Sequence, residues 1–500
     1  MSDLDLVHAT PGVELEARPQ LARSLGELEA AVRRDLEILD YPLKPWFRPV
    51  KRPDGAHVYD VVVIGGGHSG LCAAFALKRE KILNSIVLDE NPAGMEGPWQ
   101  TYARMPDLRT RKSVTGAELG YPNLTYRAYF EARFGAEAYQ ALKRITCDEW
   151  SSYLAWMRRL LELPVQNDTK VHLIEREDGM FRLDAMTSGK NTAIYARRIV
   201  LASGPLSTGG TTIPDAIAQG LPRGAYGHVY DDVDFAALKG KRVIVIGAGA
   251  SAFDNAGTAL ESGCREVHML VRRPHIPRLS LIRWTDWSGF LNTYADLDDD
   301  QRWKLAREVQ RNPSPPPIRA LNRVDKRSDF HIHFSSPPMS ARMEGAEVVV
   351  VTPNGEHRAD YVLCATGFSA RLEEAPLFAS IGRHIALWRD KFTPPDGGSE
   401  KFLSSPYLGR HYEFMEKAPG AAPWLKHIFN FSQSATLSMG PTGRVSGLKY
   451  GVRRLMIGVS NSFVREDFDQ HLESVRRYND SELDGHPWVE KPPNSKGDPS

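Results

Sequence analysis

Two segments of the chain repeat one pattern, in which a short apolar run ends in a glycine cluster and is followed by an apolar helical period and a second apolar run. The first copy begins at Tyr59 and the second at Gly240. A strand that turns through glycines into a helix, followed by a second parallel strand, is the β-α-β unit of Rossmann-like folds. The sequence therefore predicts an α/β protein with two such domains, each of the three-layer ββα type.

The first glycine cluster has the spacing G-x-G-x-x-G and comprises Gly65, Gly66, Gly67, His68, Ser69 and Gly70. Gly65 permits a tight turn, Gly67 lets a pyrophosphate approach the backbone, and Gly70 lets the helix pack closely on the strand. The second strand ends in Asp89 and Glu90, where a carboxylate can bind the hydroxyls of an adenosine ribose. The pattern favours a nucleotide site over a glycine-rich turn without a ligand. It leaves open whether Asp89 or Glu90 holds the ribose.

The second cluster has the spacing G-x-G-x-x-A and provides Gly247, Gly249, Ala250, Ser251 and Ala252. Its second strand ends in Arg272 and Arg273, where the first unit has an acid. A carboxylate there would repel a 2′-phosphate, whereas guanidinium groups bind one through charge-assisted hydrogen bonds. The pair therefore favours NADPH over NADH. The alternative is a solvated arginine pair at a strand end.

The remaining strands suggest how the two units are connected. Residues 170–177, 180–186 and 192–198 read as three short strands before a further one at 199–204. The sheet of the first unit still lacks strands after residue 205, and an apolar strand starts at Asp360. We expect the second unit to be inserted into the first. The predicted division is an N-terminal extension at 1–57 with a helix over 25–39, a first domain at 58–206 and 360–470, a second domain at 207–359 with an aromatic and proline-rich insertion at 274–327, and a tail at 471–500.

Charge and hydropathy restrict the partners. The chain has 63 basic and 62 acidic residues and a formal net charge of +1, so its charge gives no reason to expect a nucleic acid or an anionic membrane as partner. No apolar run approaches the about 18 residues that span a bilayer, and the N-terminus lacks the apolar core of a signal peptide. We expect a cytoplasmic protein with a small-molecule substrate, without excluding a homo-oligomer.

An acid-terminated first site followed by an arginine-terminated second site resembles the flavoproteins that bind FAD first and NADPH second. Residues 94–99, which end in Pro98 and Trp99, resemble the G-G-x-W segment of the class B flavin-dependent monooxygenases, which include the N-hydroxylating enzymes. Residues 363–368, with Thr366 and Gly367, are similar to the A-T-G-[YF] strand of that family. Residues 224–228 match part of its F-x-G-x-x-x-H fingerprint.

The fingerprint also departs from the family. Pro222 stands where the family has Phe, and Asp232 stands where its Baeyer–Villiger subgroup has Trp or Pro. These departures weaken a Baeyer–Villiger assignment and leave the family unchanged. Val171 and Gly204 complete the candidate cofactor contacts.

The resemblance implies that NADPH reduces FAD, that the reduced flavin forms a C4a-(hydro)peroxide with O2, and that one oxygen atom is transferred to a small electron-rich substrate at nitrogen or sulfur. The cofactor then supplies the difficult chemistry, and the protein supplies orientation and desolvation. Three alternatives remain: hydroxylation of an electron-rich heteroaromatic such as a purine, Baeyer–Villiger oxidation, and a non-oxygenating FAD/NADPH oxidoreductase or redox sensor.

Several residues are candidates for direct roles. Arg109 and Lys112, in the basic segment 103–113, are candidates to stabilise the reduced flavin or bind an anionic substrate, and otherwise belong to a solvated loop. His228 is a candidate to hold the geometry that protects the reactive flavin. The turn at 438–443, with Gly440, precedes an apolar helix whose N-terminus suits the flavin's pyrimidine edge. Trp284, Trp287 and Phe290 form either a substrate wall or core.

Metal and disulfide chemistry have weak sequence signals. His331 and His333 alternate on one face of a predicted strand, and without an evident third ligand we interpret them as structural and predict no metal site. The four cysteines lie far apart without a C-x-x-C pair, which disfavours a disulfide relay.

Overall fold

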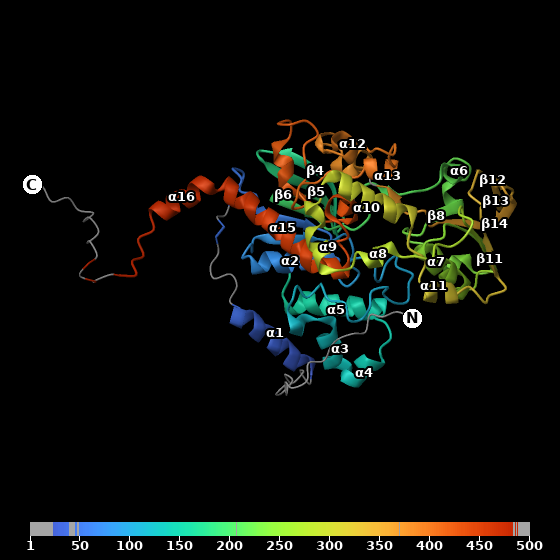
Figure 1. The fold of residues 1–500 in the computed structure, drawn as a ribbon, viewed down its shortest axis with the longest axis horizontal. Helices are drawn as coiled ribbons and strands as arrows, with labels where there is room; N and C mark the ends of the chain where they lie inside the picture. Colours follow the sequence, from blue (N-terminus) through green and yellow to red (C-terminus); the bar gives the residue numbers. More distant parts are fainter. Residues whose placement is uncertain are drawn as a thin grey trace, which may run out of the picture.

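The computed structural model describes residues 24–39, 46–47, 50–206, 208–369, 371–483, 486 and 488. Much of the predicted extension at 1–57 lies outside these residues. Its predicted helix is confirmed as α1 (Leu25–Leu39), which buries Leu28 and Val32. Figure 1 shows α1 below the main body, beside α3 (Tyr126–Phe134).

The larger sheet belongs to the first glycine unit. Its strands are β1 (Val58–Ile64), β2 (Ser85–Leu88), β3 (Val165–Gln166), β4 (Thr169–Glu177), β5 (Met180–Thr187), β6 (Lys190–Leu201) and β17 (Ile428–Asn430). The order is β3-β2-β1-β6-β5-β4, with β17 also paired to β6. Strands β3, β2, β1, β6 and β17 are parallel, and β4-β5-β6 form an antiparallel meander.

Strand β6 corrects one sequence prediction. Residues 192–198 and 199–204 were expected to form separate strands, but β6 runs unbroken from Lys190 to Leu201. Its first half pairs antiparallel with β5 and its second half pairs parallel with β1 and β17. Because both halves have partners, the chain needs no break between the meander and the parallel sheet.

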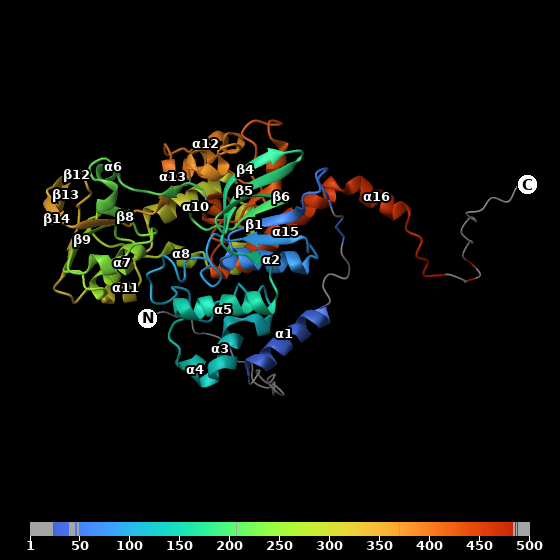
Figure 2. The same cartoon turned by 180° about the vertical axis from the view of Figure 1, so that it is seen from behind.

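Helices cover the larger sheet. Helices α2 (His68–Arg79) and α15 (Val445–Glu466) lie side by side against it, as Figures 1 and 2 show from opposite sides. Helix α5 (Cys147–Leu160) packs next to α2, with α3 and α4 (Ala136–Ala141) beyond it. The central strands are apolar on both faces, since β1 buries Val61, Val62 and Val63 completely. This agrees with a parallel sheet covered on both sides.

The smaller sheet belongs to the second glycine unit, and all its strands are parallel. The order is β11 (Phe330–His333), β10 (Glu266–Leu270), β9 (Arg242–Ile246), β15 (Tyr361–Cys364) and β8 (Tyr226–His228). Helices α7 (Ala250–Glu261) and α11 (Ile318–Asn322) pack on one face. An antiparallel sheet of β12 (Ser340–Glu344), β13 (Glu347–Thr352) and β14 (Gly355–Ala359) packs on the other.

The second unit is inserted into the first, as predicted. The entering chain forms β7 (Gly210–Thr211) and the returning chain forms β16 (Phe368–Ser369), and these two strands pair antiparallel. The expected return at residue 360 is too early, however. Strand β15 pairs with β8 and β9, so residues 361–364 belong to the smaller sheet, and the chain crosses at β16.

The segment 274–327 does not form one insertion. It comprises α8 (Leu281–Trp284), α9 (Ser288–Thr293), α10 (Asp299–Arg311) and α11. Trp303 of α10 packs with Trp388 and Leu437 on the first unit, whereas Ala320 of α11 lies in the core of the second. The segment therefore contacts both units.

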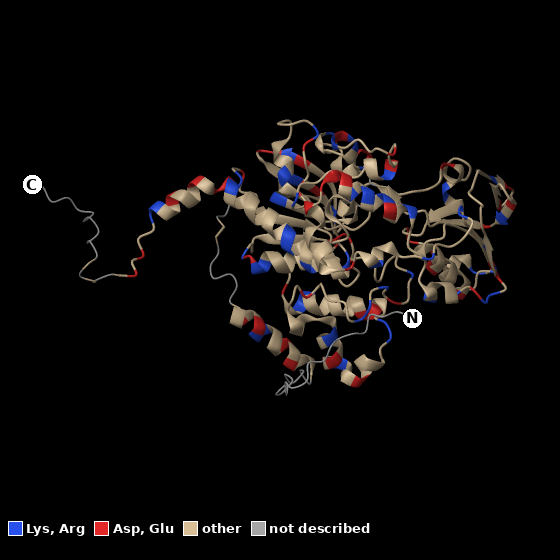
Figure 3. Ribbon diagram, viewed as in Figure 1, with Lys and Arg blue, Asp and Glu red and all other residues tan. Residues whose placement is uncertain are grey.

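Several short elements and the C-terminal end complete the description. The short helices are α6 (Asp215–Ala218), α12 (Trp388–Lys391), α13 (Glu400–Leu403) and α14 (Thr436–Met439). Helix α16 (Phe468–Arg476) buries no residue and extends from the body, and it crosses the predicted boundary at 470 (Figure 1). Figure 3 shows acidic and basic residues interspersed along the ribbon. Across the described part of the chain, no helix is long and apolar enough to cross a membrane.

Candidate cofactor and active site

The first glycine turn joins β1 to α2. Gly65 has a φ of +105°, and a Cβ there would lie 2.6 Å from the Ala202 carbonyl oxygen. A Cβ at Gly70 would lie 1.8 Å from the Gly65 carbonyl oxygen. The close contacts therefore require glycine at both positions, and the turn directs the N-terminus of α2 toward an anion site. The turn and the start of α2 also contain Gly66, Gly67, His68 and Ser69.

The two acids after β2 have different surroundings. The Asp89 carboxylate is 5% exposed and accepts hydrogen bonds from the Gly66 amide at 2.6 Å and the Asn91 amide at 2.9 Å. Burial raises the pKa of Asp89. Glu90 is exposed and pairs with Lys170 at 2.8 Å. Asp89 is therefore the acid that lies against the glycine turn.

A cavity of ≈ 340 Å³ opens beside this turn. It is lined by Gly66, Leu71, Ala93, Gly94, Glu96, Ser151, Leu154, Ala155, Arg158 and Arg159. Glu96 orders one wall, because its carboxylate accepts hydrogen bonds from the Gly94 amide and the Asn167 side chain, both at 2.8 Å, and pairs with Arg158. The cavity is therefore bounded by the glycine turn and by mostly apolar walls that carry a few charged side chains, a lining that a nucleotide can occupy.

The segment 438–443 docks onto the glycine turn. The His68 Nε2 atom lies 3.0 Å from the Gly443 carbonyl oxygen. The ring centroids of His68 and Trp99 lie 5.7 Å apart, and Trp99, which follows Pro98, is 8% exposed. The structure thus brings together three of the predicted segments, which are far apart in the sequence.

Other predicted cofactor residues hold the linkers or lie on the sheet. The Thr366 hydroxyl donates a hydrogen bond to the Thr212 carbonyl oxygen. The Thr212 amide in turn donates a hydrogen bond to the Gly367 carbonyl oxygen at 2.9 Å. Gly204 follows β6 with a φ of +69°, and Val171 lies in β4. Contacts of these residues with a cofactor stay predictions.

The second glycine turn joins β9 to α7. Gly247 has a φ of +133°, and a Cβ there would lie 2.6 Å from the Ala365 carbonyl oxygen. A Cβ at Gly249 would meet no atom within 4 Å. Ala250, Ser251 and Ala252 form the first turn of α7, and Ala252 is fully buried. The open side of Gly249 is where a pyrophosphate can approach the backbone.

Arg272 and Arg273 follow β10. Arg272 is exposed and Arg273 is half-buried, and neither side chain forms an ion pair with any described residue. Burial and the neighbouring Arg272 lower the pKa of Arg273. Two adjacent guanidinium groups without a carboxylate partner suit an anionic ligand such as a 2′-phosphate.

His228 is buried where the two units meet. Its side chain is fully buried, and burial lowers its pKa to about 4, so the imidazole is neutral at neutral pH. The ring stacks on Tyr230 with centroids 5.4 Å apart. Tyr230 in turn packs against Tyr102 of the first unit and Phe368 of the returning linker. This arrangement suits a positioning role for His228.

Arg109 and Lys112 lie apart. The Arg109 guanidinium pairs with the Asp254 carboxylate of α7 at 3.1 Å and so joins the first unit to the second. Lys112 donates hydrogen bonds to the carbonyls of Tyr139 at 2.5 Å and Gln140 at 3.1 Å, at the end of α4. The positive charge of Lys112 is thus stabilised at a helix C-terminus. Roles of either residue toward the flavin or substrate stay predictions.

Replacing Arg109 with glutamine should destabilise the protein by about 1–2 kcal/mol, because Asp254 is 4% exposed and, among the described residues, would keep Arg323 alone as an ion-pair partner, at 3.8 Å. Burial raises the pKa of Asp254, and Arg109 opposes that rise. The loss should therefore be larger above the folded-state pKa of Asp254 than below it, where the carboxyl is protonated. Thermal unfolding at several pH values measures this effect.

Arg111→Gln is the matched control, because Arg111 is exposed on the same loop. If Arg109→Gln unfolds like the parent at every pH but its flavin is reduced more slowly, Arg109 acts on the flavin instead of joining the units.

Sequence reasoning missed the residues that connect the two units. Asp254 lies in α7 and is not part of a sequence motif. Arg323 of the segment after α11 donates to the Arg104 carbonyl at 3.0 Å and to Glu261. Arg319 of α11 pairs with Asp107. The only sequence signal was the excess of cations over acids in residues 103–113.

Comparison with known proteins identifies the family. A family model described as pyridine nucleotide-disulphide oxidoreductase matches residues 62–284. FAD-dependent urate hydroxylase from Xanthomonas campestris pv. campestris is 39% identical over 466 residues, which cover 92% of this chain and 98% of that relative.

Solved structures support the same fold. Ornithine hydroxylase from Pseudomonas aeruginosa superposes with a TM-score of 0.62 at 16% identity, over 80% of this chain and 98% of that one. An ornithine N-hydroxylase from Kutzneria sp. 744, solved with reduced FAD, NADP+ and ornithine, gives a TM-score of 0.62 at 16% identity, over 81% and 99%. At this identity the likeness concerns the fold alone.

The chain belongs to the class B flavin-dependent monooxygenases. It is an oxidoreductase with FAD and NADPH as cofactors, and the predictions of family, nested α/β fold, cofactors and enzyme class are confirmed. The residues fit these groups, since the first glycine turn lies beside Asp89 and a cavity. The second turn lies in the unit that carries Arg272 and Arg273, which form no ion pair with a described residue. The four cysteines are buried and free, and burial raises the pKa of each thiol, so a disulfide relay lacks its reactive pair.

Proposed function

We propose that this protein hydroxylates a purine, with urate as the substrate. The observation that carries the proposal is the 39% identity to a urate hydroxylase over 92% of this chain. It favours the heteroaromatic alternative over oxygenation at nitrogen or sulfur, which was the first expectation from the sequence. The solved N-hydroxylases are 16% identical and support the fold without supporting their own substrates.

The balance of the reaction is that of a monooxygenase. One atom of O2 enters the purine as a hydroxyl group, and the other leaves as water. NADPH supplies two electrons, through FAD, and becomes NADP+. The protein's own residues bind, orient and exclude water. We assign Gly65, Gly67 and Gly70 to the FAD turn and Gly247 and Gly249 to the NADPH turn.

An aromatic cluster beside the 438–443 turn supports a planar substrate. Trp284 is 61% exposed and Trp287 is 48% exposed, and their ring centroids lie 5.9 Å apart. Both pack on Phe290, at 5.9 and 5.7 Å. Exposed indole faces next to the flavin region are suited to stack on a purine.

This cluster is connected to the turn by Tyr294. The Phe290 and Tyr294 ring centroids lie 5.3 Å apart, and a Cβ at Gly440 would lie 2.9 Å from the Tyr294 ring. Gly440, with a φ of +77°, lets the turn lie directly on that ring. The aromatic wall, the turn and the start of α15 therefore form one continuous surface.

Arg444 supplies a cation at this surface. It precedes α15 directly after the turn and is exposed; the atoms packed around its guanidinium lower its pKa, and the nearby Asp286 opposes that fall. Urate is an anion at neutral pH, and a guanidinium binds a planar anion through directed hydrogen bonds. We assign Arg444 to substrate binding and Trp284 and Trp287 to stacking.

The test is turnover of the purified holoenzyme with NADPH and 18O2 on urate, xanthine, ornithine and a thioether. We expect urate to be consumed in step with NADPH and its product to carry one 18O atom. Ornithine and the thioether should yield only hydrogen peroxide. Oxygenation of ornithine or the thioether, with urate unchanged, would contradict the proposal.

Arg444→Gln should raise KM for urate by about 10- to 100-fold, because a hydrogen bond to a charged group contributes about 1.5–3 kcal/mol. FAD content and KM for NADPH should stay as in the parent. Arg453→Gln is the matched control, since Arg453 is exposed on the same helix. Equal KM values for urate in the two variants would remove Arg444 from the substrate site.

A further inference from the structure

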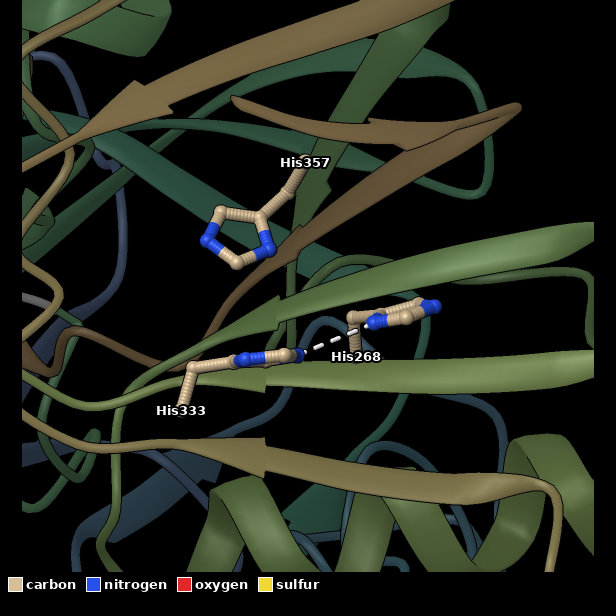
Figure 4. A group of neighbouring side chains, drawn as sticks. All are labelled: His268, His333 and His357. Carbon is tan, nitrogen blue, oxygen red and sulfur yellow. Dashed lines mark hydrogen bonds between the residues drawn. The ribbon is translucent and has the colours of Figure 1, made fainter. Parts of the chain in front are cut away.

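Three histidines from three strands point toward one another in the second unit (Figure 4). They are His268 of β10, His333 of β11 and His357 of β14. The His268 Nδ1 and His333 Nε2 atoms are 3.0 Å apart, and the His333 and His357 ring centroids are 4.4 Å apart. One ring nitrogen from each lies within 4.8 Å of the other two.

The fold brings these rings together from two sheets. Strands β10 and β11 are parallel with His268 beside His331 and Leu270 beside His333, so His268 and His333 share a face. Strand β14 belongs to the antiparallel sheet that covers this face and carries His357 across from them. The sequence interpretation of His331 and His333 as structural rested on the lack of a third ligand. His268 and His357 remove that reason.

Hydrogen bonds select the nitrogen that His357 presents. The Thr352 hydroxyl donates to the Gly355 carbonyl at 3.1 Å, and His357 Nε2 lies 3.3 Å from the same hydroxyl oxygen. Because that hydroxyl hydrogen is already used, the oxygen accepts from Nε2–H of His357. The lone pair of His357 then resides on Nδ1, the nitrogen that Figure 4 shows facing the other two rings.

A carboxylate supports His268 in the same way. The Glu266 Oε2 atom lies 3.8 Å from His268 Nε2, on the side of the ring away from His333. A carboxylate near the outer nitrogen favours a proton there and leaves the inner Nδ1 free. Ligating histidines in metal sites commonly have such an outer partner, a carboxylate or another oxygen.

We propose that His268, His333 and His357 bind one divalent transition-metal ion of the zinc class. Metal–nitrogen distances of about 2.0–2.1 Å separate two ligand nitrogens by about 3.3 Å in a tetrahedral site, close to the 3.0 Å between His268 and His333. Three neutral imidazoles without a carboxylate ligand favour zinc, cobalt, nickel or copper over magnesium or calcium. The rings are partly exposed, so solvent supplies the remaining coordination position.

The position of the site suggests what the ion does. It connects β14 to β10 and β11, directly before the segment 334–336. There the Ser335 amide donates to the Arg273 carbonyl at 3.0 Å and the Ser336 amide to the Val271 carbonyl at 2.8 Å. The ion therefore fastens the antiparallel sheet to the strand end that carries the arginine pair. Stabilisation of the folded protein by bound metal follows by mass action.

A second group shares His268 and provides the competing assignment. Glu266, His268 and His331 also lie within 4.8 Å of one another through one ligand atom each. Glu266 lies 3.9 Å from His331 Nε2. That set would use the outer nitrogen of His268, so substitutions distinguish the two groups.

The experiment uses the full-length holoenzyme after dialysis against EDTA. Zn2+ alone is titrated in competition with a chromophoric chelator, and Co2+ is added in parallel to record its visible ligand-field spectrum. We expect one Zn2+ per chain, a higher thermal midpoint with Zn2+, and a Co2+ spectrum typical of low coordination. Absence of stoichiometric binding in the parent protein overturns the proposal.

Variants locate the ligands. His333→Gln and His357→Gln should each weaken Zn2+ binding by more than about 100-fold, because even loss of an outer partner costs about 10- to 100-fold. His331→Gln is the matched control on the same strand and should bind as the parent. A loss in His331→Gln with retention in His357→Gln would assign the ion to the second group.

Thr352 tests the inference without removing a ligand. Thr352→Val keeps the shape but removes the hydroxyl that accepts from His357, and should weaken Zn2+ binding by about 10-fold or more. Thr352→Ser should restore it. FAD content in every variant reports that the chain is folded, and unchanged affinity in Thr352→Val would show that His357 is not the ligand held by this bond.

Discussion

Replacing Arg272 and Arg273 together with glutamine should abolish the preference for NADPH over NADH. Each hydrogen bond to a charged phosphate is worth about 1.5–3 kcal/mol, so KM for NADPH should rise by about 10- to 100-fold. NADH lacks the 2′-phosphate, so its KM should change little. Steady-state rates of flavin reduction with each coenzyme measure the ratio.

The structure indicates that this change spares the fold. Neither guanidinium has an ion-pair partner among the described residues, and the two like charges are adjacent, so their removal breaks no ion pair that the described residues form. The end of β10 is held by the backbone instead, through the Ser335 amide on the Arg273 carbonyl at 3.0 Å. A changed KM would therefore report the phosphate site.

The control removes two exposed arginines of the same unit, as Arg223→Gln with Arg278→Gln. This variant has the same net charge as the first, so it corrects for long-range attraction of the coenzyme. Equal use of NADPH and NADH by the parent protein would refute the assignment of the pair. An equal rise of KM for NADPH in the Arg272/Arg273 variant and in the Arg223/Arg278 control would also refute it.

The parts of this fold that the sequence predicts are local. The β1 strand, the turn from Gly65 to Gly70 and helix α2 lie within about twenty consecutive residues, and their apolar periods and glycine spacing act through neighbouring atoms. The same holds for β9, Gly247 and α7. Position also predicts that Asp89 or Glu90 lies near the turn, because a residue at the end of β2 meets the turn at the same sheet edge, and the structure places Asp89 there.

Strand assignments that depend on distant partners do not follow from the sequence. Strand β15 is an apolar run that fits either sheet, and only its pairing with β8 and β9 shows that it belongs to the second unit. Residues 192–204 contain a polar-to-apolar change, which was interpreted as two strands. The change reflects different partners along one strand. Local pattern does not encode which strand pairs with which.

The contacts between the two units could not be predicted from the sequence either, because they join residues that lie far apart in the chain. Arg109 lies in a basic loop, and nothing near it in the sequence indicates its carboxylate partner, Asp254, which lies 145 residues away in α7. His357 is a single histidine in a polar hairpin, and nothing nearby predicts that it faces His268. One signal was available, since Glu266 and His268 alternate on β10 as His331 and His333 do on β11.

Gly70→Ala should yield a protein that lacks bound FAD and unfolds at a much lower temperature. A Cβ at this position would lie 1.8 Å from the Gly65 carbonyl oxygen and 2.9 Å from the Gly65 carbonyl carbon. Both are backbone atoms of the turn itself, so no side chain can move to relieve the overlap. Helix α2 must shift away from β1, at a cost of about 3 kcal/mol or more. The flavin released by denaturation and the thermal midpoint measure the effect.

Gly249→Ala is the matched comparison, because the same methyl group at the second turn would meet no atom within 4 Å. Its backbone is extended, with φ −80° and ψ 177°, which alanine adopts without strain. This variant should fold, bind FAD as the parent does, and raise KM for NADPH by on the order of 10-fold, since the methyl group projects where a pyrophosphate approaches. Unchanged use of NADPH by Gly249→Ala would show that the coenzyme does not approach this turn. Full FAD content in Gly70→Ala would show that the turn can widen, and the close packing of α2 on β1 would then not be what holds the flavin.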